Sequence, residues 1–382
     1  MIKNIGNKFS CPSSFYTKST FLRTLVIESY FHDPKIALSK FPCLRSLNLG
    51  FCSIKEVPIE IRKCIHLRYL NLSCNFDLEE LPEALCELCN LQTLDITACM
   101  NLKKLPHGLG NLINLRHFLN WRVFKITYMP KSLQRLTGLL SLGEFYISKD
   151  RFNRKTCSVE CLKNFKHLRK IAITGLGNLR GVDKVKGIEL NNKKNLRELG
   201  LGFFETMNED HEELLETLQP HPNLESLWLR DYRGNNMFPN WMMSLTNLRK
   251  LLLGECIKCE HLPPLGKLSS LEILQIEDMN DVVRVGIEFL GIESEVALSS
   301  SSVIAFPKLK FLSFTMMKKW EEWDFEITNR GGEDIIVMPS LKTLQLLVCP
   351  KLKSLPNHLC QMTTLKVEID GCPLLVQQRT HS

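Results

Sequence analysis

The chain has 382 residues, of which 44% are hydrophobic, and this fraction is sufficient for a continuous core. Its net charge of +8 is unevenly distributed: residues 1–200 hold 32 Lys and Arg against 16 Asp and Glu, whereas residues 201–382 hold 17 against 25. The sequence contains neither an apolar run of roughly eighteen residues nor an N-terminal apolar signal segment, so we expect a cytoplasmic protein with no membrane partner.

A repeat of 24 residues is clearest between Pro82 and Pro106. Its template positions hold Leu91, Leu94, Ile96 and Cys99. The spacing Leu-x-x-Leu-x-Leu-x-x-Asn/Cys is the leucine-rich repeat template, which has a period of roughly 20–29 residues. Alternate leucines of a short strand point inwards, and parallel strands of successive repeats lie about 4.8 Å apart. Because no repeat can bury its own leucines, each is stabilised by its neighbours.

Residues 22–147 are expected to be the regular repeats, after a weak N-terminal end at 1–21. Proline recurs every 24 residues, where it fixes φ as the chain crosses to the outer side. These prolines are Pro58, Pro82, Pro106 and Pro130. One regular repeat has a defect, because its third core position is the polar Asn120. The first template residues in this part are Leu22, Leu44, Leu67, Leu91, Leu115 and Leu139.

Residues 148–223 predict longer and less regular repeats, with polar insertions at 149–166 and 177–195. The acidic stretch from Glu205 to Glu216 predicts a short helix on the convex side. Residues 224–375 return to the template, with a mobile loop near 291–306, and residues 376–382 form a tail. The sequence therefore predicts one domain over 1–382, an α/β leucine-rich repeat solenoid of about 13–14 repeats. A parallel sheet would line its concave face, with loops and short helices on its convex face.

Cysteine often holds the last template position, where we expect it to fill a small buried turn whose backbone groups need partners. These cysteines are Cys52, Cys99, Cys256, Cys349 and Cys372. All fifteen cysteines are expected to be reduced thiols.

Two Cys-x-x-Cys pairs invite a zinc interpretation, and they begin at Cys86 and Cys256. The pairs of a structural zinc site normally lie roughly 15–20 residues apart, far closer than these two. The sequence also lacks a phosphate-binding loop and any fixed grouping of Ser, His, Cys and carboxylates. We therefore expect no metal, no cofactor and no enzymatic activity.

The residue after the first template leucine is repeatedly basic. These residues are Arg23, Arg45, Arg68, Arg116, Arg169, Arg197, Arg249, Lys310 and Lys342. Stacked in register, they would form a basic edge along the concave sheet. Long stems that cover apolar surface are one explanation, and docking of an acidic protein surface is the other. Nucleic acid is disfavoured as a partner, because no aromatic-interleaved basic motif accompanies the series. The candidate partner-binding residues of this edge are Arg45, Arg68, Arg116, Arg169 and Arg197.

A second candidate set consists of large side chains at outward strand positions. Its members are Tyr69, Trp121, Phe203, Trp228 and Arg230. Aromatic residues and arginine are the usual anchors of protein-binding hot spots. For any single residue of this set, the alternative to partner binding is that neighbouring outer side chains shield it from solvent. As a set, these residues favour a protein-binding concave face.

Several longer motifs extend beyond the repeat template. They include Asn90-Leu91-Gln92-Thr93-Leu94, Phe238-Pro239-x-Trp241, Leu262-Pro263-Pro264-Leu265-Gly266, Val285-Gly286-x-Glu288-Phe289 and Trp320-Glu321-Glu322-Trp323. With them the chain resembles, over nearly its whole length, the leucine-rich repeat domain of plant intracellular disease resistance receptors. These are the coiled-coil, nucleotide-binding, leucine-rich repeat immune receptors.

The resemblance implies two roles in defence, namely holding a nucleotide-binding switch domain inactive and sensing a pathogen effector or a guarded host protein. It also implies that the basic N-terminal repeats pack against that switch domain. The chain has no coiled coil and no nucleotide-binding motif, so ATP binding does not carry over and we expect a piece of a receptor. A free-standing leucine-rich repeat adaptor or scaffold is the alternative, and a secreted ectodomain is disfavoured because no signal segment is present.

Overall fold

The computed structural model describes residues 2–3, 21–28, 38–150, 154–179, 181–204, 211–256, 258–292, 303–325 and 335–375. The chain divides into two compact units. Unit 1 comprises residues 1–175 and 187–189, and unit 2 comprises residues 176–186 and 190–382. The division falls inside the stretch 148–223, where the sequence predicts irregular repeats. Among the described residues, no helix combines the length and apolar character needed to cross a membrane.

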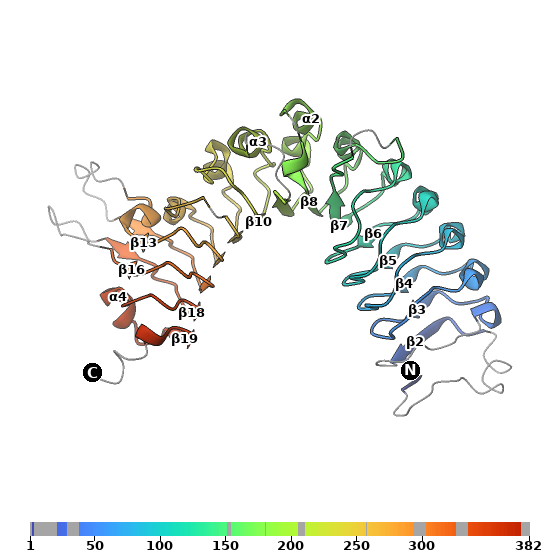
Figure 1. Cartoon of the computed structure of the whole chain (residues 1–382), viewed down its shortest axis with the longest axis horizontal. Coiled ribbons are helices and arrows are strands. Elements are labelled where there is room, and N and C mark those ends of the chain that lie inside the picture. The colour runs from blue at the N-terminus through green and yellow to red at the C-terminus, as the bar shows by residue number, and fades with distance from the viewer. Residues whose placement is uncertain are drawn as a thin grey trace. The chain divides into compact units, whose positions relative to one another are not determined.

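Unit 1 is a stack of parallel strands, of which β2 to β7 are each followed by a short 3-10 helix on the opposite side of the repeat (Figure 1). Its strands are β1 (Ile2–Lys3), β2 (Thr24–Glu28), β3 (Ser46–Asn48), β4 (Tyr69–Asn71), β5 (Thr93–Asp95), β6 (His117–Leu119), β7 (Ser141–Tyr146) and β8 (Lys170–Thr174). Its 3-10 helices are η1 (Leu38–Lys40), η2 (Ile59–Lys63), η3 (Glu83–Glu87), η4 (His107–Asn111), η5 (Lys131–Arg135) and η6 (Val159–Asn164). Each strand pairs in parallel with the next, in chain order.

The template residues of unit 1 form its core, as the sequence predicts. Leu44 and Leu47, for example, are fully buried. The recurring prolines stand directly before helices η2 to η5, with φ between −60° and −70°. Proline suits this place because its ring fixes φ and the first amide of a helix needs no internal partner.

The predicted defect at Asn120 is a built feature of the sheet. Asn120 is fully buried, and its Nδ2 donates to the Glu144 carbonyl at 2.8 Å while its Oδ1 accepts from the Glu144 amide at 2.9 Å. The pairing between β7 and β8 shifts register between Ser141 and Glu144. A Cβ on Gly143 would lie 2.7 Å from the backbone nitrogen of Asn120, so only glycine fits there. The polar side chain thus satisfies the backbone of a β-bulge.

Unit 2 repeats the same arrangement of parallel strands. The strands of its main sheet are β9 (Glu198–Gly202), β10 (Ser226–Arg230), β11 (Lys250–Gly254), β12 (Ile273–Glu277), β15 (Phe311–Thr315), β18 (Thr343–Leu347) and β19 (Lys366–Asp370). Its helices are η7 (Leu176–Asn178), α2 (Asp183–Lys186), η8 (Leu190–Asn192), α3 (His211–Thr217), η9 (Asn240–Ser244), η10 (Leu265–Lys267), η11 (Ile287–Leu290) and α4 (Asn357–Cys360). Helix α3 confirms the predicted acidic helix over its described part, and most of the loop predicted near 291–306 lies outside the described residues.

Two small parallel sheets accompany the longer repeats of unit 2. One pairs β13 (Arg284–Val285) with β16 (Glu322–Trp323), and the other pairs β14 (Ile304–Ala305) with β17 (Ile336–Val337). Behind the first sheet, Trp320 and Trp323 are buried against Phe314, with ring centroids 4.6 and 5.3 Å from that of the phenylalanine. The Trp-Glu-Glu-Trp motif is therefore a core element of this unit.

The last template position closes the turn after each strand. In unit 1, the Nδ2 atom of Asn75 donates to the carbonyls of Leu49 and Leu72, and its Oδ1 accepts from the amides of Cys52 and Ile54. The Cys99 thiol donates to the same Leu72 carbonyl at 3.1 Å. These contacts confirm that this position provides partners for buried backbone groups.

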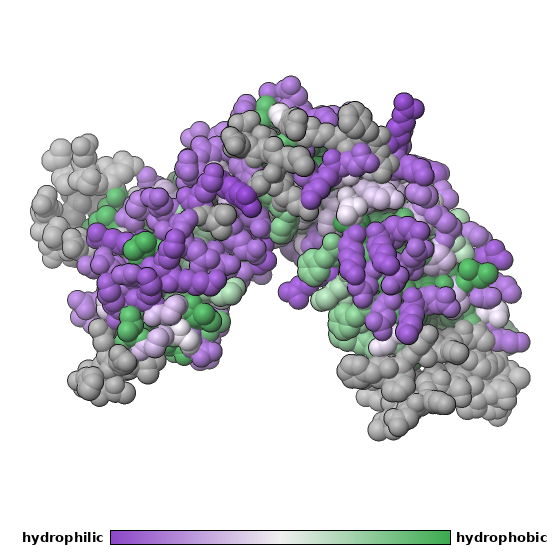
Figure 2. Space-filling model, in the orientation of Figure 1, coloured by the Kyte–Doolittle hydropathy of each residue, from purple (hydrophilic) through white to green (hydrophobic). Residues whose placement is uncertain are grey.

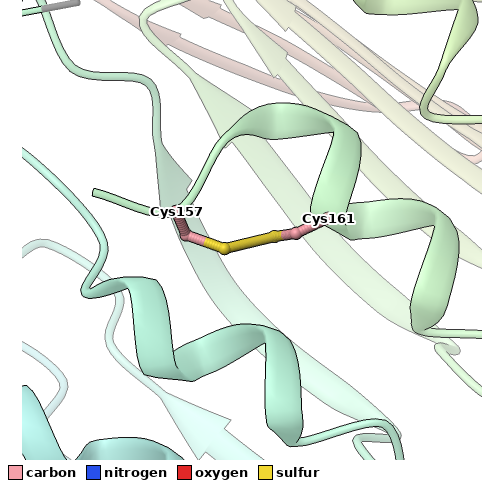
Figure 3. Close-up of a disulfide and its surroundings, with 2 residues drawn as sticks. All are labelled: Cys157 and Cys161. Carbon is pink, nitrogen blue, oxygen red and sulfur yellow. A yellow bond between two sulfur atoms is a disulfide. The ribbon is translucent and has the colours of Figure 1, made fainter. Parts of the chain in front are cut away.

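The expectation of reduced thiols is wrong at one pair, because Cys157 and Cys161 form a disulfide at the start of η6 (Figure 3). Their Cα atoms lie 6.6 Å apart, a separation that a disulfide spans. The other cysteines within the described ranges are free thiols. Burial raises the pKa of the Cys86 and Cys259 thiols to about 12, so these two members of the Cys-x-x-Cys pairs are neutral core residues.

Candidate protein-binding surface

The residue that follows the first template leucine, here called the edge position, forms one hydrogen-bonded column in unit 1. The Arg68 amide donates to the Arg45 carbonyl, the Gln92 amide to the Arg68 carbonyl, and the Arg116 amide to the Gln92 carbonyl, each at 2.8 Å. The Leu140 amide continues the column to the Arg116 carbonyl at 2.7 Å. The stacking that the sequence predicts is confirmed for unit 1.

The arginines of this column carry uncompensated charge. Arg45, Arg68, Arg116 and Arg169 are exposed, and no carboxylate within the described ranges lies within 4.0 Å of any of them. Burial and the nearby Arg169 guanidinium both lower the pKa of His117. A positive potential therefore extends over this edge and disfavours a further positive charge.

The edge position of unit 2 has a different electrostatic character. Arg197 Nε lies 3.2 Å from a Glu225 carboxylate oxygen, and the Glu272 carboxylate contacts Arg249 at 3.9 Å and Lys310 at 2.6 Å. Positive and negative side chains alternate in adjacent repeats from Arg197 to Lys310, so this part of the column neutralises itself, and the next edge residue is the basic Lys342. Arg197, which the sequence groups with the arginines of unit 1, belongs to this paired column.

The outward aromatic residues of unit 1 lie on the strand face, meaning the side of the sheet away from the core. Tyr69 is 37% exposed, and burial and the Asp95 carboxylate raise its pKa. Trp121 is half-buried, and the Lys170 ammonium lies 5.2 Å from its ring centroid. That distance is within the range of a cation–π contact. Both rings are partly accessible from the strand face.

In unit 2 the prediction that Phe203 faces outwards is wrong. Phe203 is fully buried, with its ring centroid 4.9 Å from that of His211 and 5.3 Å from that of Tyr232. It follows β9 directly, and His211 of helix α3 in the same repeat and Tyr232 of the next repeat cover it, so the outward alternation has already ended there.

The other two members of the predicted set are half-buried in unit 2. The Trp228 ring lies over Gly200, and any larger residue at 200 would overlap it. The Arg230 guanidinium contacts the carboxylates of Glu277 at 2.8 Å and Glu255 at 3.6 Å. Their neighbours therefore already engage both side chains.

Sequence reasoning missed a second column beside the edge position. It lies two residues before each first template leucine, and in three consecutive repeats of unit 1 it holds Ile65, Cys89 and Ile113, all exposed. The repeats of unit 1 on either side hold Pro42, Thr137 and Lys166 there. Figure 2 shows such hydrophobic side chains interspersed among hydrophilic ones on the molecular surface. The signal in the sequence was an apolar residue at a place where the template requires none.

Comparison with known proteins identifies the repeats. The family profile described as R13L1/DRL21 leucine-rich repeats matches residues 159–279. The candidate disease resistance protein RGA1 of Solanum bulbocastanum is 42% identical over 254 residues, which cover 66% of this chain and 25% of that protein. The repeats are thus similar to those of plant disease resistance proteins. The candidate disease resistance RPP13-like protein 1 of Arabidopsis thaliana is 34% identical over 227 residues, which cover 56% of the chain and 21% of that protein.

The repeats share their fold with leucine-rich repeats of distant origin. The functional domain of InlJ from Listeria monocytogenes, whose structure includes a cysteine ladder, aligns with a TM-score of 0.51 over 88% of this chain and 65% of that one, at 15% identity. Leucine-rich repeats are in general a protein-interaction fold without enzymatic activity. The chain spans about a quarter or less of the length of the curated relatives described above.

Proposed function

We propose that the chain is the recognition and autoinhibition module of a plant disease resistance receptor in the cytoplasm. In this proposal the basic edge of unit 1, formed by Arg45, Arg68, Arg116 and Arg169, binds an acidic surface of a nucleotide-binding switch domain. The absence of a nearby carboxylate at these four arginines carries the proposal, because in unit 2 the edge residues Arg197, Arg249 and Lys310 each contact a carboxylate of the same column. The resemblance to disease resistance proteins supports the choice of partner.

The strand face is the proposed site for a pathogen effector or a guarded host protein. Tyr69 and Trp121 offer aromatic surface in unit 1, and Trp228 offers it in unit 2. Aromatic rings supply large contact areas with little loss of side-chain entropy. Phe203 is left out because it is buried.

Co-purification with the nucleotide-binding module of a related receptor tests the proposal. The triple variant Arg45→Glu, Arg68→Glu and Arg116→Glu is expected to bind the module at least about tenfold more weakly, because reversed charges repel an acidic surface. Higher salt should weaken the wild-type complex, since exposed charges are screened beyond about 8–10 Å.

The matched control places the same reversals at the edge position of unit 2, in Arg249→Glu, Lys310→Glu and Lys342→Glu. This variant should retain binding, with folding of both proteins checked by circular dichroism. Equal binding by wild type and the unit 1 variant would overturn the proposal and favour the free-standing adaptor, which needs no nucleotide-binding partner.

A further inference from the structure

The column of Ile65, Cys89 and Ile113, here called the edge strip, is an exposed apolar line on consecutive repeats of unit 1. Ile65 is 56% exposed and Ile113 is 60% exposed. Side-chain amides fix its backbone: Asn90 Nδ2 donates to the Ile65 carbonyl and Asn114 Nδ2 to the Cys89 carbonyl, both at 2.8 Å. The strip is therefore a firm surface whose apolar side chains the fold leaves uncovered.

The edge strip and the basic edge belong to one surface. Only His66 and the buried Leu67 separate Ile65 from Arg68 along the chain. The Arg116 guanidinium turns towards the strip side, because its Nη1 donates to the Gly138 carbonyl, one residue before the next template leucine. Apolar and cationic groups thus lie next to each other in the repeats of Ile65 and Ile113, and the repeat between them has Gln92 at the edge position.

Unit 2 lacks this combination. Its residues two before the first template leucine are polar or proline, and they are Lys194, Pro222, Thr246, Ser269, Pro307 and Pro339. The amide contact itself persists there, since Asn223 Nδ2 donates to the Lys194 carbonyl at 3.1 Å. The apolar residues of unit 1 are therefore no requirement of the repeat, and the repeats of Ile65 and Ile113 also carry the unpaired Arg68 and Arg116. The edge position and the edge strip therefore both differ from their counterparts in unit 2, and they do so in the same part of unit 1.

We infer that this surface of unit 1 binds an amphipathic α-helix of a partner protein, with apolar side chains on the edge strip and carboxylates against the arginines. The inference rests on the acidic partner of the proposed function and adds the shape of its contacting segment. Adjacent parallel strands lie about 4.8 Å apart, and a helix rises about 5.4 Å per turn. A helix along the edge can therefore place one apolar side chain over each repeat and acidic side chains beside Arg68 and Arg116.

An extended segment fits this surface less well. Two residues of a strand advance about 6.6 Å, so a strand falls out of step with the repeats by almost 2 Å at each one. Over the two steps from Ile65 to Ile113, a helix accumulates a mismatch of only about 1.2 Å. The spacing of the repeats selects a helical partner.

A synthetic peptide tests the inference without a nucleotide-binding module. The probe is a blocked helical peptide of about 18 residues, or five turns, with Leu once per turn and Glu beside each Leu. Alkylation of the exposed Cys89 thiol reports on coverage of the strip, and the exposed Cys360 in unit 2 is the internal reference. Saturating peptide should slow alkylation of Cys89 at least about fivefold and leave that of Cys360 unchanged.

Matched variants locate the contact. The double variant Ile65→Ser and Ile113→Ser should weaken peptide binding at least about tenfold, whereas Ile59→Ser, an equally exposed isoleucine on η2, should not. A peptide of the same composition with its leucines spread around the helix should not protect Cys89.

Protection of both cysteines or of neither, or equal binding by the Ile65/Ile113 variant, would overturn the inference. Because the peptide assay omits the switch domain, these outcomes leave the charge-reversal test intact. If the switch domain binds through charge alone, the charge-reversal variant will lose binding to it, while the peptide will not protect Cys89.

Discussion

At the edge position, unit 1 presents Arg45, Arg68 and Arg116 with no carboxylate in reach among the described residues, whereas unit 2 alternates Arg197 with Glu225 and continues with paired charges. The backbone hydrogen bonds of the two columns are the same in kind and length. The fold therefore does not dictate the side chain at this position. The column of unit 2 is internally paired from Arg197 to Lys310, whereas the exposed arginines of unit 1 are available to an external acidic partner.

The turn after each strand gives the largest expected difference between the units. In unit 1, Asn75→Ala removes partners from four buried backbone groups and is expected to lower the free energy of unfolding by about 3–5 kcal/mol. In unit 2, Cys256→Ala removes one thiol contact and should lower it by about 1–2 kcal/mol. Urea unfolding compares the two, and equal losses would contradict this account of the turn.

The next largest effect on stability is expected at the β-bulge of unit 1. Asn120→Leu restores the template but removes the side-chain partners of the Glu144 backbone amide and carbonyl. We therefore expect the free energy of unfolding to fall by about 2 kcal/mol rather than to rise. The control Asn111→Leu, at an exposed amide, should change stability by less than about 0.5 kcal/mol. A more stable Asn120→Leu protein in thermal unfolding would show that the polar core residue is a defect after all.

The turn of unit 2 also contains a pH-sensitive group that unit 1 lacks, since Asp231 occupies the place where unit 1 has Ala98. Burial and the Glu255 carboxylate raise the pKa of Asp231 to about 6. A carboxyl group with a raised folded pKa contributes stability below the unfolded value of about 4 and loses that contribution as pH rises through 6. Because the side chain is only half-buried, its effect is discounted to about 1 kcal/mol.

Asp231→Asn tests this titration. The variant should gain stability over wild type as pH rises from 4 to 7, by about 1 kcal/mol in urea unfolding. A difference between the two proteins that stays constant across this range would contradict it.

The paired column of unit 2 gives the smallest effect. The ion pair of Arg197 with Glu225 is partly exposed, so a double-mutant cycle with alanine at both positions should give a coupling of about 0.5 kcal/mol. Added salt should reduce it further. A coupling above about 2 kcal/mol would contradict this expectation and would mean that the ion pair contributes substantially to the stability of unit 2.

Local spacing predicts most of the fold. The template leucines, the prolines before η2 to η5 and the stacked edge position all follow from residues within one repeat period. The acidic helix is likewise visible in the sequence, because its charge pattern is local. These features agree because each repeat meets its neighbours in the same way.

Contacts that depend on a neighbouring repeat could not be predicted. The burial of Phe203 depends on α3 and Tyr232, and the neutralisation of Arg197 depends on a carboxylate 28 residues further along the chain. The role of Asn120 depends on a bulge in the following strand. A template assigns positions, whereas charge balance and shielding arise only when two different repeats stack.

The hydrogen bonds of the edge column have a consequence for how such a surface can change. The Arg45 carbonyl accepts both the Arg68 and Tyr69 amides, and no side-chain atom takes part in these bonds. Almost any residue can therefore occupy the edge without disturbing the ladder. Mutation can explore new partners there one repeat at a time, and a pair of repeats could be exchanged between related proteins as a recognition cassette while the scaffold stays the same.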